Sequence, residues 1–473
     1  MTQADLFGFT YLFGLALLAS AACVLGLAVF LKIETAMGRW VAAAMVPIMA
    51  LAIAASTLLS RRDLKYAFGN IEAIALNPVP GSSMLLRMIT AVIVGMGAAS
   101  IIARLYRKSV GQRLPGQLLL VSFLVFYVCN EILNSAFGTY PAFSHNTLYV
   151  PVVFGAVYLG RNEPIDDFVR WAKIALLGLM VLSLLAAVAL PSVALEPNYK
   201  SWIPGLTVRL WGVGSNANSI GPLALLLILL ELLCPAAART SRIASFGLAL
   251  AVLLLAQSKT AILAGLLVAP IVIWFRLGRH PAGGVRIGFV LGVLLVLVAT
   301  TLVLMVGNLD KMWARLSGGQ VGSDISSLGG RVQIWIAAIN AWQDNPLFGY
   351  GPEAWGPLHR ATIGMPFAFS AHNQFLQSLS VAGGLGLLSF ILFLVVLFIY
   401  ACRAVKVTQG ISLALFFMVF IRSLTEAPFS TGGLFNGDTL TLLVLFRLAL
   451  LGGRPSVIRQ TSPPFTQVKG FPA

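Results

Sequence analysis

The sequence predicts an all-α polytopic membrane protein, and three observations support this fold class. Of the 473 residues, 58% are hydrophobic and only 10% are charged, whereas a soluble globular domain carries about 25% charged residues. The mean hydropathy is +0.90. The apolar residues also fall in stretches of the length that membrane helices need, about 20 residues each. A soluble core cannot absorb this much apolar surface, because burial is limited by the ratio of surface to volume.

Thirteen apolar stretches are candidates for membrane helices. They lie at 8–31, 39–60, 84–105, 116–137, 146–160, 171–193, 219–237, 242–257, 260–276, 285–307, 374–401, 411–427 and 436–451. Several are short, and one early stretch need not cross the membrane, so we expect about twelve helices. Around Gln257-Ser258-Lys259, the stretch 242–276 could form either a tight hairpin or a broken helix. The N-terminus lacks the basic region of a signal peptide, so we expect the first stretch to be retained.

The formal net charge is +16, from 32 Lys and Arg against 16 Asp and Glu. Basic residues accumulate in the cytoplasmic loops of membrane proteins, which explains most of this excess without a nucleic-acid partner; the remainder is open to binding an anionic substrate. The basic loops predict a cytoplasmic C-terminus. The run 61–65 also looks cytoplasmic by charge, yet counting helices back from the basic loop 104–113 places it outside.

The predicted helices divide the chain into four parts. Residues 1–307 hold membrane helices and a short non-cytoplasmic loop at 194–218, and residues 308–371 form one large non-cytoplasmic loop with short amphipathic helices. Residues 372–451 hold the C-terminal membrane helices, and 452–473 form a cytoplasmic tail. Long loops on rigid scaffolds often carry chemistry, so we expect the function in the large loop.

Four of the nine tryptophans lie in the large loop, at Trp313, Trp335, Trp342 and Trp355. They could form an interfacial belt, the core of a small packed subdomain, or a surface on which sugars stack. In 331–342, the residues Val332, Trp335, Ile336, Ile339 and Trp342 recur at helical spacing, which predicts a short amphipathic helix resting on the membrane bundle.

Several reaction classes have no motif in this chain. It contains no phosphate-binding loop of an ATP-driven pump, no zinc-protease motif and no Gly-x-Ser-x-Gly elbow. The four cysteines (Cys23, Cys129, Cys234 and Cys402) and the four histidines show no metal-type spacing, so we expect neither a disulfide, a metal nor another cofactor.

A few polar residues on the predicted outer side could perform chemistry. His372 lies where the large loop enters the next helix; it could act as a base, or merely cap or pack the helix. Arg209 and Arg331 could clamp a diphosphate, although external arginines also extend towards lipid headgroups. Lys259 could add positive charge, with the same reservation. Asn218 or Ser219 could cap the helix that begins there.

These residues lie in motifs that recur in a known order. The Arg209 segment ends in Gly-x-x-x-Asn-x-Asn, and Ser258-Lys259-Thr260 and Gly330-Arg331-x-x-x-Trp335 follow. Next come Pro346-Leu347-Phe348-Gly349-Tyr350-Gly351, Ala371-His372-Asn373-Gln374-Phe375-Leu376-Gln377 and Gly383-Gly384-Leu385-Gly386. Over roughly residues 200–400 the chain resembles the O-antigen ligase and O-antigen polymerase superfamily of bacterial envelope glycosyltransferases. One departure is Lys259, where arginine is common in that family.

The resemblance implies a GT-C-type bundle of about twelve transmembrane helices in a Gram-negative inner membrane, with the active site facing the periplasm. It implies an undecaprenyl-diphosphate-linked glycan as donor and lipid A–core as acceptor. The single dominant late loop favours the ligase over the polymerase, and a branch that glycosylates proteins is a further alternative. A transporter of lipid-linked glycans is the rival from another class, although we find no internal repeat.

The chemistry of this donor predicts a role for each candidate residue. Arg209 and Arg331 would stabilise the departing diphosphate, and His372 would be the general base in an inverting, metal-independent transfer. We assign substrate binding to Lys259, Asn218, Asn373 and Trp335. For Arg422 and Glu426, four residues apart near the last external turn, a structural ion pair is favoured over a catalytic role. Glu131 and Glu231 are scattered within predicted helices.

Overall fold

The computed structural model describes residues 24–26, 28–32, 40–60, 62–65, 84–106, 115–199, 201, 203, 205–277, 328–366, 368–429 and 433–453. Within these residues the protein is mostly helical, and seven helices are long and apolar enough to cross a membrane. The prediction of a polytopic helical membrane protein is therefore confirmed. The predicted helix 285–307 and most of 8–31 lie outside the described residues, so the total of about twelve stays a prediction.

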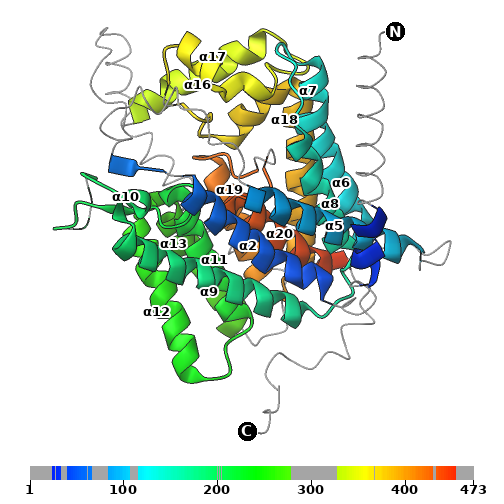
Figure 1. The fold of residues 1–473 in the computed structure, drawn as a ribbon, viewed down its shortest axis with the longest axis vertical. Helices are drawn as coiled ribbons and strands as arrows, with labels where there is room; N and C mark the ends of the chain where they lie inside the picture. Colours follow the sequence, from blue (N-terminus) through cyan, green and yellow to red (C-terminus); the bar gives the residue numbers. More distant parts are fainter. Residues whose placement is uncertain are drawn as a thin grey trace, which may run out of the picture.

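The long helices follow the predicted apolar stretches closely (Figure 1). Their bounds are α2 (Val41–Leu59), α5 (Met84–Tyr106), α6 (Gln117–Tyr127), α8 (Tyr149–Leu159), α9 (Ile165–Ala189), α11 (Ala217–Leu233), α12 (Arg239–Ala256), α13 (Lys259–Leu277), α18 (Gln374–Ala404), α19 (Ile411–Ser423) and α20 (Gly437–Ala449). A π-helical turn, Val128–Leu133, joins α6 to the short α7 (Asn134–Phe137). The stretch 242–276 forms two helices, α12 and α13, because Gln257 between them adopts a left-handed φ of 47°.

Two short helices occupy the centre of the bundle. Nearly every residue of α11 and of α20 is buried, as expected for a helix that is apolar on all sides and surrounded by other helices. Beside them, the Phe123 ring stacks on Phe154 with centroids 4.2 Å apart and meets Phe446 at 5.8 Å. Helices such as α5 instead expose many large apolar side chains, which suits a surface that faces lipid.

The segment after α2 lies on the same side of the bundle as the loop between α9 and α11. Arg62 donates hydrogen bonds to the carbonyls of Val193 and Gly214, which belong to that loop. Four predicted membrane crossings separate Arg62 from Val193, an even number that agrees with one side. Arg62 therefore lies with the loop between α9 and α11, as the count of helices predicts, and not with the predicted cytoplasmic loops, as the charge of the run 61–65 indicates.

The described part of the large loop forms a helical cap over α18. It contains α16 (Leu328–Gln343), a 3-10 turn at Pro352–Trp355 and α17 (Pro357–Thr362), which lie together at one end of the molecule (Figure 1). Three tryptophans are half-buried and donate hydrogen bonds, Trp335 to Ala371, Trp342 to Pro346 and Trp355 to Ser380. Among the alternatives for these three tryptophans, this favours a small packed subdomain. Trp313 lies outside the described residues.

The predicted helix over 331–342 is confirmed as α16, but its buried face differs from the predicted one. Ile334, Ala338 and Ala341 are buried against the rest of the protein, whereas Ile336 and Ile339 are exposed. Arg331 lies one helical turn before Ile334, so it is on the face that turns towards the bundle.

The Pro346–Gly351 segment is inserted into a break in α18. At Gly383 the backbone leaves the helix with φ of 66°, which frees backbone groups on both sides. Tyr350 N–H donates to Ser380 O at 2.8 Å and Gly384 N–H donates to Pro346 O at 2.8 Å. These bonds satisfy groups that an apolar environment would otherwise leave unpaired. The loop thereby fixes the direction of the first turns of α18, which follow directly from His372.

Candidate functional site

Glu426 is the centre of a cluster of charged and polar side chains. It lies in the loop after α19, which ends at Ser423, and only 12% of its side chain is exposed. One carboxylate oxygen lies 3.0 Å from His372 Nδ1; the other accepts a hydrogen bond from Asn218 Nδ2 at 2.9 Å and lies 3.6 Å from an Arg331 nitrogen. Four separate segments of the chain thus meet at one carboxylate.

The position of His372 is set by the start of α18. Asn373 is the N-cap, and its side-chain oxygen accepts hydrogen bonds from the N–H groups of Phe375 and Leu376. His372 itself adopts a left-handed backbone with φ of 47°, and Trp335 holds the preceding residue by donating to Ala371 O at 3.1 Å. Asn373 thus caps the helix that follows His372, and Trp335 fixes the backbone of the residue that precedes it.

Arg209 joins the cluster through Asn218. Its Nη2 donates to Asn218 Oδ1 at 2.7 Å and its Nε donates to Ala256 O at 2.9 Å. The predicted capping role of Asn218 is wrong, because α11 begins at Ala217 with Asn216 at the N-cap and no side-chain cap. The amide of Asn218 instead bridges Arg209 and Glu426, which accounts for its inward direction.

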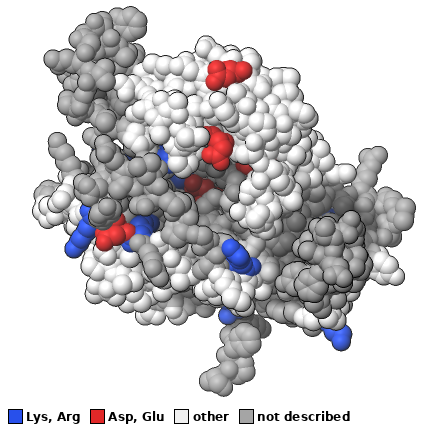
Figure 2. Space-filling model, turned by 45° about the horizontal axis from the view of Figure 1, so that its top comes forward, with Lys and Arg blue, Asp and Glu red and all other residues white. Residues whose placement is uncertain are grey.

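The cluster is open to solvent on one side. The side chains of Arg331 and His372 are each 30% exposed, so both can be reached from solvent. Basic and acidic side chains lie together in a hollow near the middle of this face of the molecule (Figure 2). Such a mixture of fixed positive charge and a carboxylate-supported imidazole can bind an anion and accept a proton in the same place.

Burial and charge act in opposite directions on the two acidic groups near the site. Burial alone would raise the pKa of Glu426, but the hydrogen bond and charge of His372, together with the charges of Arg331 and Arg422, lower the pKa overall. Burial raises the pKa of Glu196, against the hydrogen bond from Trp211 and the charge of Arg209. Glu426 is therefore held ionised beside His372.

Lys259 is near the cluster in the chain but does not contact it among the described residues. It is exposed and begins α13, three residues after Ala256, whose carbonyl binds Arg209. His372, Arg331, Arg209 and Asn218 are brought together around Glu426, whereas Lys259 stands at the edge.

Glu426 was missed as the centre of the site, because its spacing from Arg422 indicated a local structural pair. In the structure Arg422 contacts Asp438 at 2.5 Å and donates to Asn218 O at 2.9 Å. The partner of Glu426 is His372, 54 residues away in sequence. A loop carboxylate directly after an apolar helix was the available signal.

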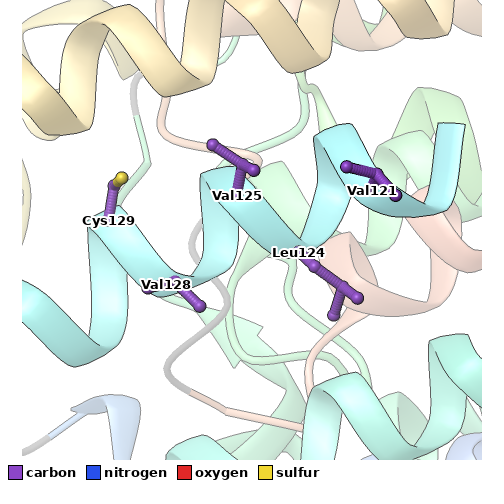
Figure 3. A pocket seen from close by; sticks show the side chains of 5 residues that line it. All are labelled: Val121, Leu124, Val125, Val128 and Cys129. Carbon is purple, nitrogen blue, oxygen red and sulfur yellow. The ribbon is translucent and has the colours of Figure 1, made fainter. Parts of the chain in front are cut away.

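Two further features of the described residues concern metal-binding groups and pockets away from the Glu426 cluster. Among the described residues, no group of three or more His, Cys, Asp and Glu side chains could hold a metal ion. A shallow hollow on the outside of α6 is lined by Val121, Leu124, Val125, Val128 and Cys129 (Figure 3). These side chains are apolar or weakly polar and suit contact with lipid rather than chemistry.

Comparison with known families finds a match over part of the chain. The family model described as O-antigen ligase matches residues 244–391. The predicted resemblance to the O-antigen ligase family is thereby confirmed over these residues. No curated protein matches the chain. The matched O-antigen ligase segment contains Arg331 and His372, whereas Arg209, Asn218 and Glu426 lie outside it and reach the cluster through the fold.

Proposed function

We propose that this protein transfers an O-antigen polysaccharide from undecaprenyl diphosphate to lipid A–core at the periplasmic face of a Gram-negative inner membrane. The observation that carries the proposal is the pairing of His372 with Glu426 at 3.0 Å beside Arg331 and within one bridging amide of Arg209. A general base and fixed positive charge are the two groups that transfer from a glycosyl diphosphate requires. A GT-C-type bundle of about twelve helices would carry the site.

In the proposed reaction His372 activates the acceptor. With Nδ1 turned to Glu426, Nε2 is free to take the proton from an acceptor hydroxyl, and the carboxylate stabilises the imidazolium that forms. The hydroxyl oxygen then bonds to the anomeric carbon as the bond from that carbon to the diphosphate oxygen breaks. The diphosphate leaves with the electron pair, and the configuration at carbon inverts.

The two arginines would stabilise the leaving group. Arg331 and Arg209 carry permanent charge, and guanidinium groups bind phosphate oxygens in pairs. The amide of Asn218 hydrogen-bonds both Arg209 and Glu426 and so would fix the position of Arg209 relative to the carboxylate. Lys259 would supply positive charge at the edge of the site. Trp335 and Asn373 would act mainly by holding His372 in place.

Reconstitution of the reaction tests this proposal. The protein, purified in detergent, is mixed with undecaprenyl-diphosphate-linked glycan, lipid A–core and EDTA, and product is followed as a mobility shift of the core on a gel. We expect product with EDTA present, and a loss of about 10²–10⁴-fold for His372→Ala. The matched control is His145→Ala, because His145 is an exposed histidine whose ring packs near Tyr149, away from the Glu426 cluster in sequence.

Each alternative has its own result in the same experiment. Elongation of the donor without a core shift would assign a polymerase, and transfer to a protein acceptor would assign the protein-glycosylating branch. If neither product forms while the donor crosses liposome membranes, the protein is a transporter. A requirement for added Mg²⁺ would contradict metal independence.

A further inference from the structure

Arg62 uses all of its donors on one loop. Its Nε and Nη2 donate to Val193 O at 2.9 and 2.6 Å, and Nη2 also donates to Gly212 O at 2.9 Å. Its Nη1 donates to Gly214 O at 2.9 Å and to Ser215 O at 3.0 Å. A guanidinium has five N–H groups, so none remains for a ligand.

Three of the four carbonyls that Arg62 binds belong to the segment that carries Arg209 and Asn218. Gly212, Gly214 and Ser215 lie between Arg209, in a short strand (Arg209–Leu210), and Asn218, in the first turn of α11. This stretch has little regular structure of its own, and Gly212 adopts a left-handed φ of 57°. Within the part of the chain that the structure describes, Arg62 is the donor to these carbonyls, which lie outside the strands and helices.

Arg62 is also linked to Arg209 by side-chain contacts through Trp211 and Glu196. The Arg62 guanidinium lies 5.3 Å from the centre of the Trp211 ring. Trp211 Nε1 donates to Glu196 at 2.7 Å, and the same carboxylate oxygen lies 3.8 Å from Arg209. Burial lowers the pKa of Arg62 to about 10, which still leaves it charged at neutral pH.

We infer that Arg62 is a positioning residue for donor binding: it holds the 211–216 turn so that Arg209 and Asn218 face Glu426. This inference rests on the proposed function, in which Arg209 binds the donor diphosphate. Lysine cannot replace Arg62 here, because an ammonium is a compact charge with three donors and no planar fork. The N-terminal third of the chain therefore contributes to the site without contacting the substrate.

The test compares Arg62→Lys with Lys65→Met, a change at an exposed lysine three residues further along the same segment. Amide hydrogen exchange is measured in the full-length protein in detergent, over 193–216 and, as a control for folding, over α9 and α11. The KM values for donor and acceptor are measured in the reconstituted transfer. Arg62→Lys keeps the charge, so it is preferred to Arg62→Ala, and retained exchange protection in α9 and α11 shows that the bundle is folded.

We expect faster exchange confined to 193–216 and a donor KM raised on the order of 10-fold, with the acceptor KM and the Lys65→Met variant unchanged. Unchanged exchange, or an equal rise in both KM values, would overturn the inference. A wild-type protein without transferase activity would instead overturn the proposed function. In that case the exchange data alone decide whether Arg62 orders the loop, and unchanged exchange still overturns its role.

Discussion

The carboxylate of Glu426 contacts three side chains that lie far apart in the sequence. Asn218, Arg331 and His372 come from three different segments, yet each approaches the same carboxylate within 2.9 to 3.6 Å. Motifs were sufficient to single out these three partners, because Asn218 and His372 lie where loops enter apolar stretches and Arg331 opens the predicted amphipathic helix after Gly329-Gly330. They could not single out the carboxylate, since local spacing paired it with Arg422 and only the tertiary fold shows its contacts.

Replacing Glu426 with glutamine tests its role at the residue scale. Glu426→Gln keeps the shape but removes the charge that supports His372, so we expect transfer to fall about 10²-fold or more. The matched control is Glu353→Gln, in the exposed 3-10 turn of the cap. Equal activity of Glu426→Gln and the wild type would contradict a role for Glu426 in the reaction.

The same substitution predicts a change in how stability depends on pH. The pKa of Glu426 is lowered in the folded protein from its ordinary value of 4.5, so its ionised form contributes stability above that value. This contribution is lost as the pH falls through the lower folded pKa. We expect the thermal midpoint of the wild type to approach that of Glu426→Gln as the pH drops from about 6 to below about 4. Parallel curves for the two proteins would rule this out.

At the scale of elements, length and apolar composition predicted most helices, but not how they bend or turn. α16 was expected at the right residues, yet its buried face contains Ala338 and Ala341, small residues that a search for large apolar side chains overlooks. Small residues allow close approach to α18. The break in α18 was not predicted either, because a pair of glycines within an apolar stretch also occurs in continuous membrane helices.

The two adjacent glycines in α18 give a matched pair of variants. A Cβ on Gly383, where φ is 66°, would lie 2.4 Å from Leu347 O, whereas a Cβ on Gly384 would lie 3.4 Å from Pro346 O. We expect Gly383→Ala to lower the free energy of unfolding by about 1–3 kcal/mol and to reduce transfer by moving His372. Gly384→Ala should change stability by no more than about 0.5 kcal/mol. Thermal unfolding in detergent compares the stability of the two variants. Equal losses of stability would contradict a specific role for the break in α18 at Gly383.

At the scale of the whole molecule, the charge pattern and the fold disagree at the segment that follows α2. Basic loops predict the sidedness from charges that are solvated, for example at the exposed Arg170. They misplaced 61–65 because Arg62 is a structural group that binds carbonyls of the 193–215 segment. The charge of a half-buried arginine that is hydrogen-bonded to backbone carbonyls does not indicate on which side of the membrane its loop lies.

Labelling of single cysteines tests this sidedness. In a chain whose four natural cysteines are replaced, Lys65→Cys and Thr207→Cys should react with a membrane-impermeant maleimide in intact cells. Arg170→Cys should react only after the membrane is opened. All three positions are exposed in the structure. Labelling of Lys65→Cys only after opening would contradict the arrangement of α2 to α9.

The position of the carboxylate and the bridging amide outside the matched segment has a consequence for chimeric proteins. Exchanging residues 244–391 for the equivalent part of a relative would import a new histidine and a new arginine. Their partners Glu426, Asn218 and Arg209 would stay behind in the recipient. Such an exchange should therefore give an active protein only where the recipient's residues outside 244–391 fit the imported histidine and arginine. Under the proposed function, specificity for the glycan would not be transferred by residues 244–391 alone.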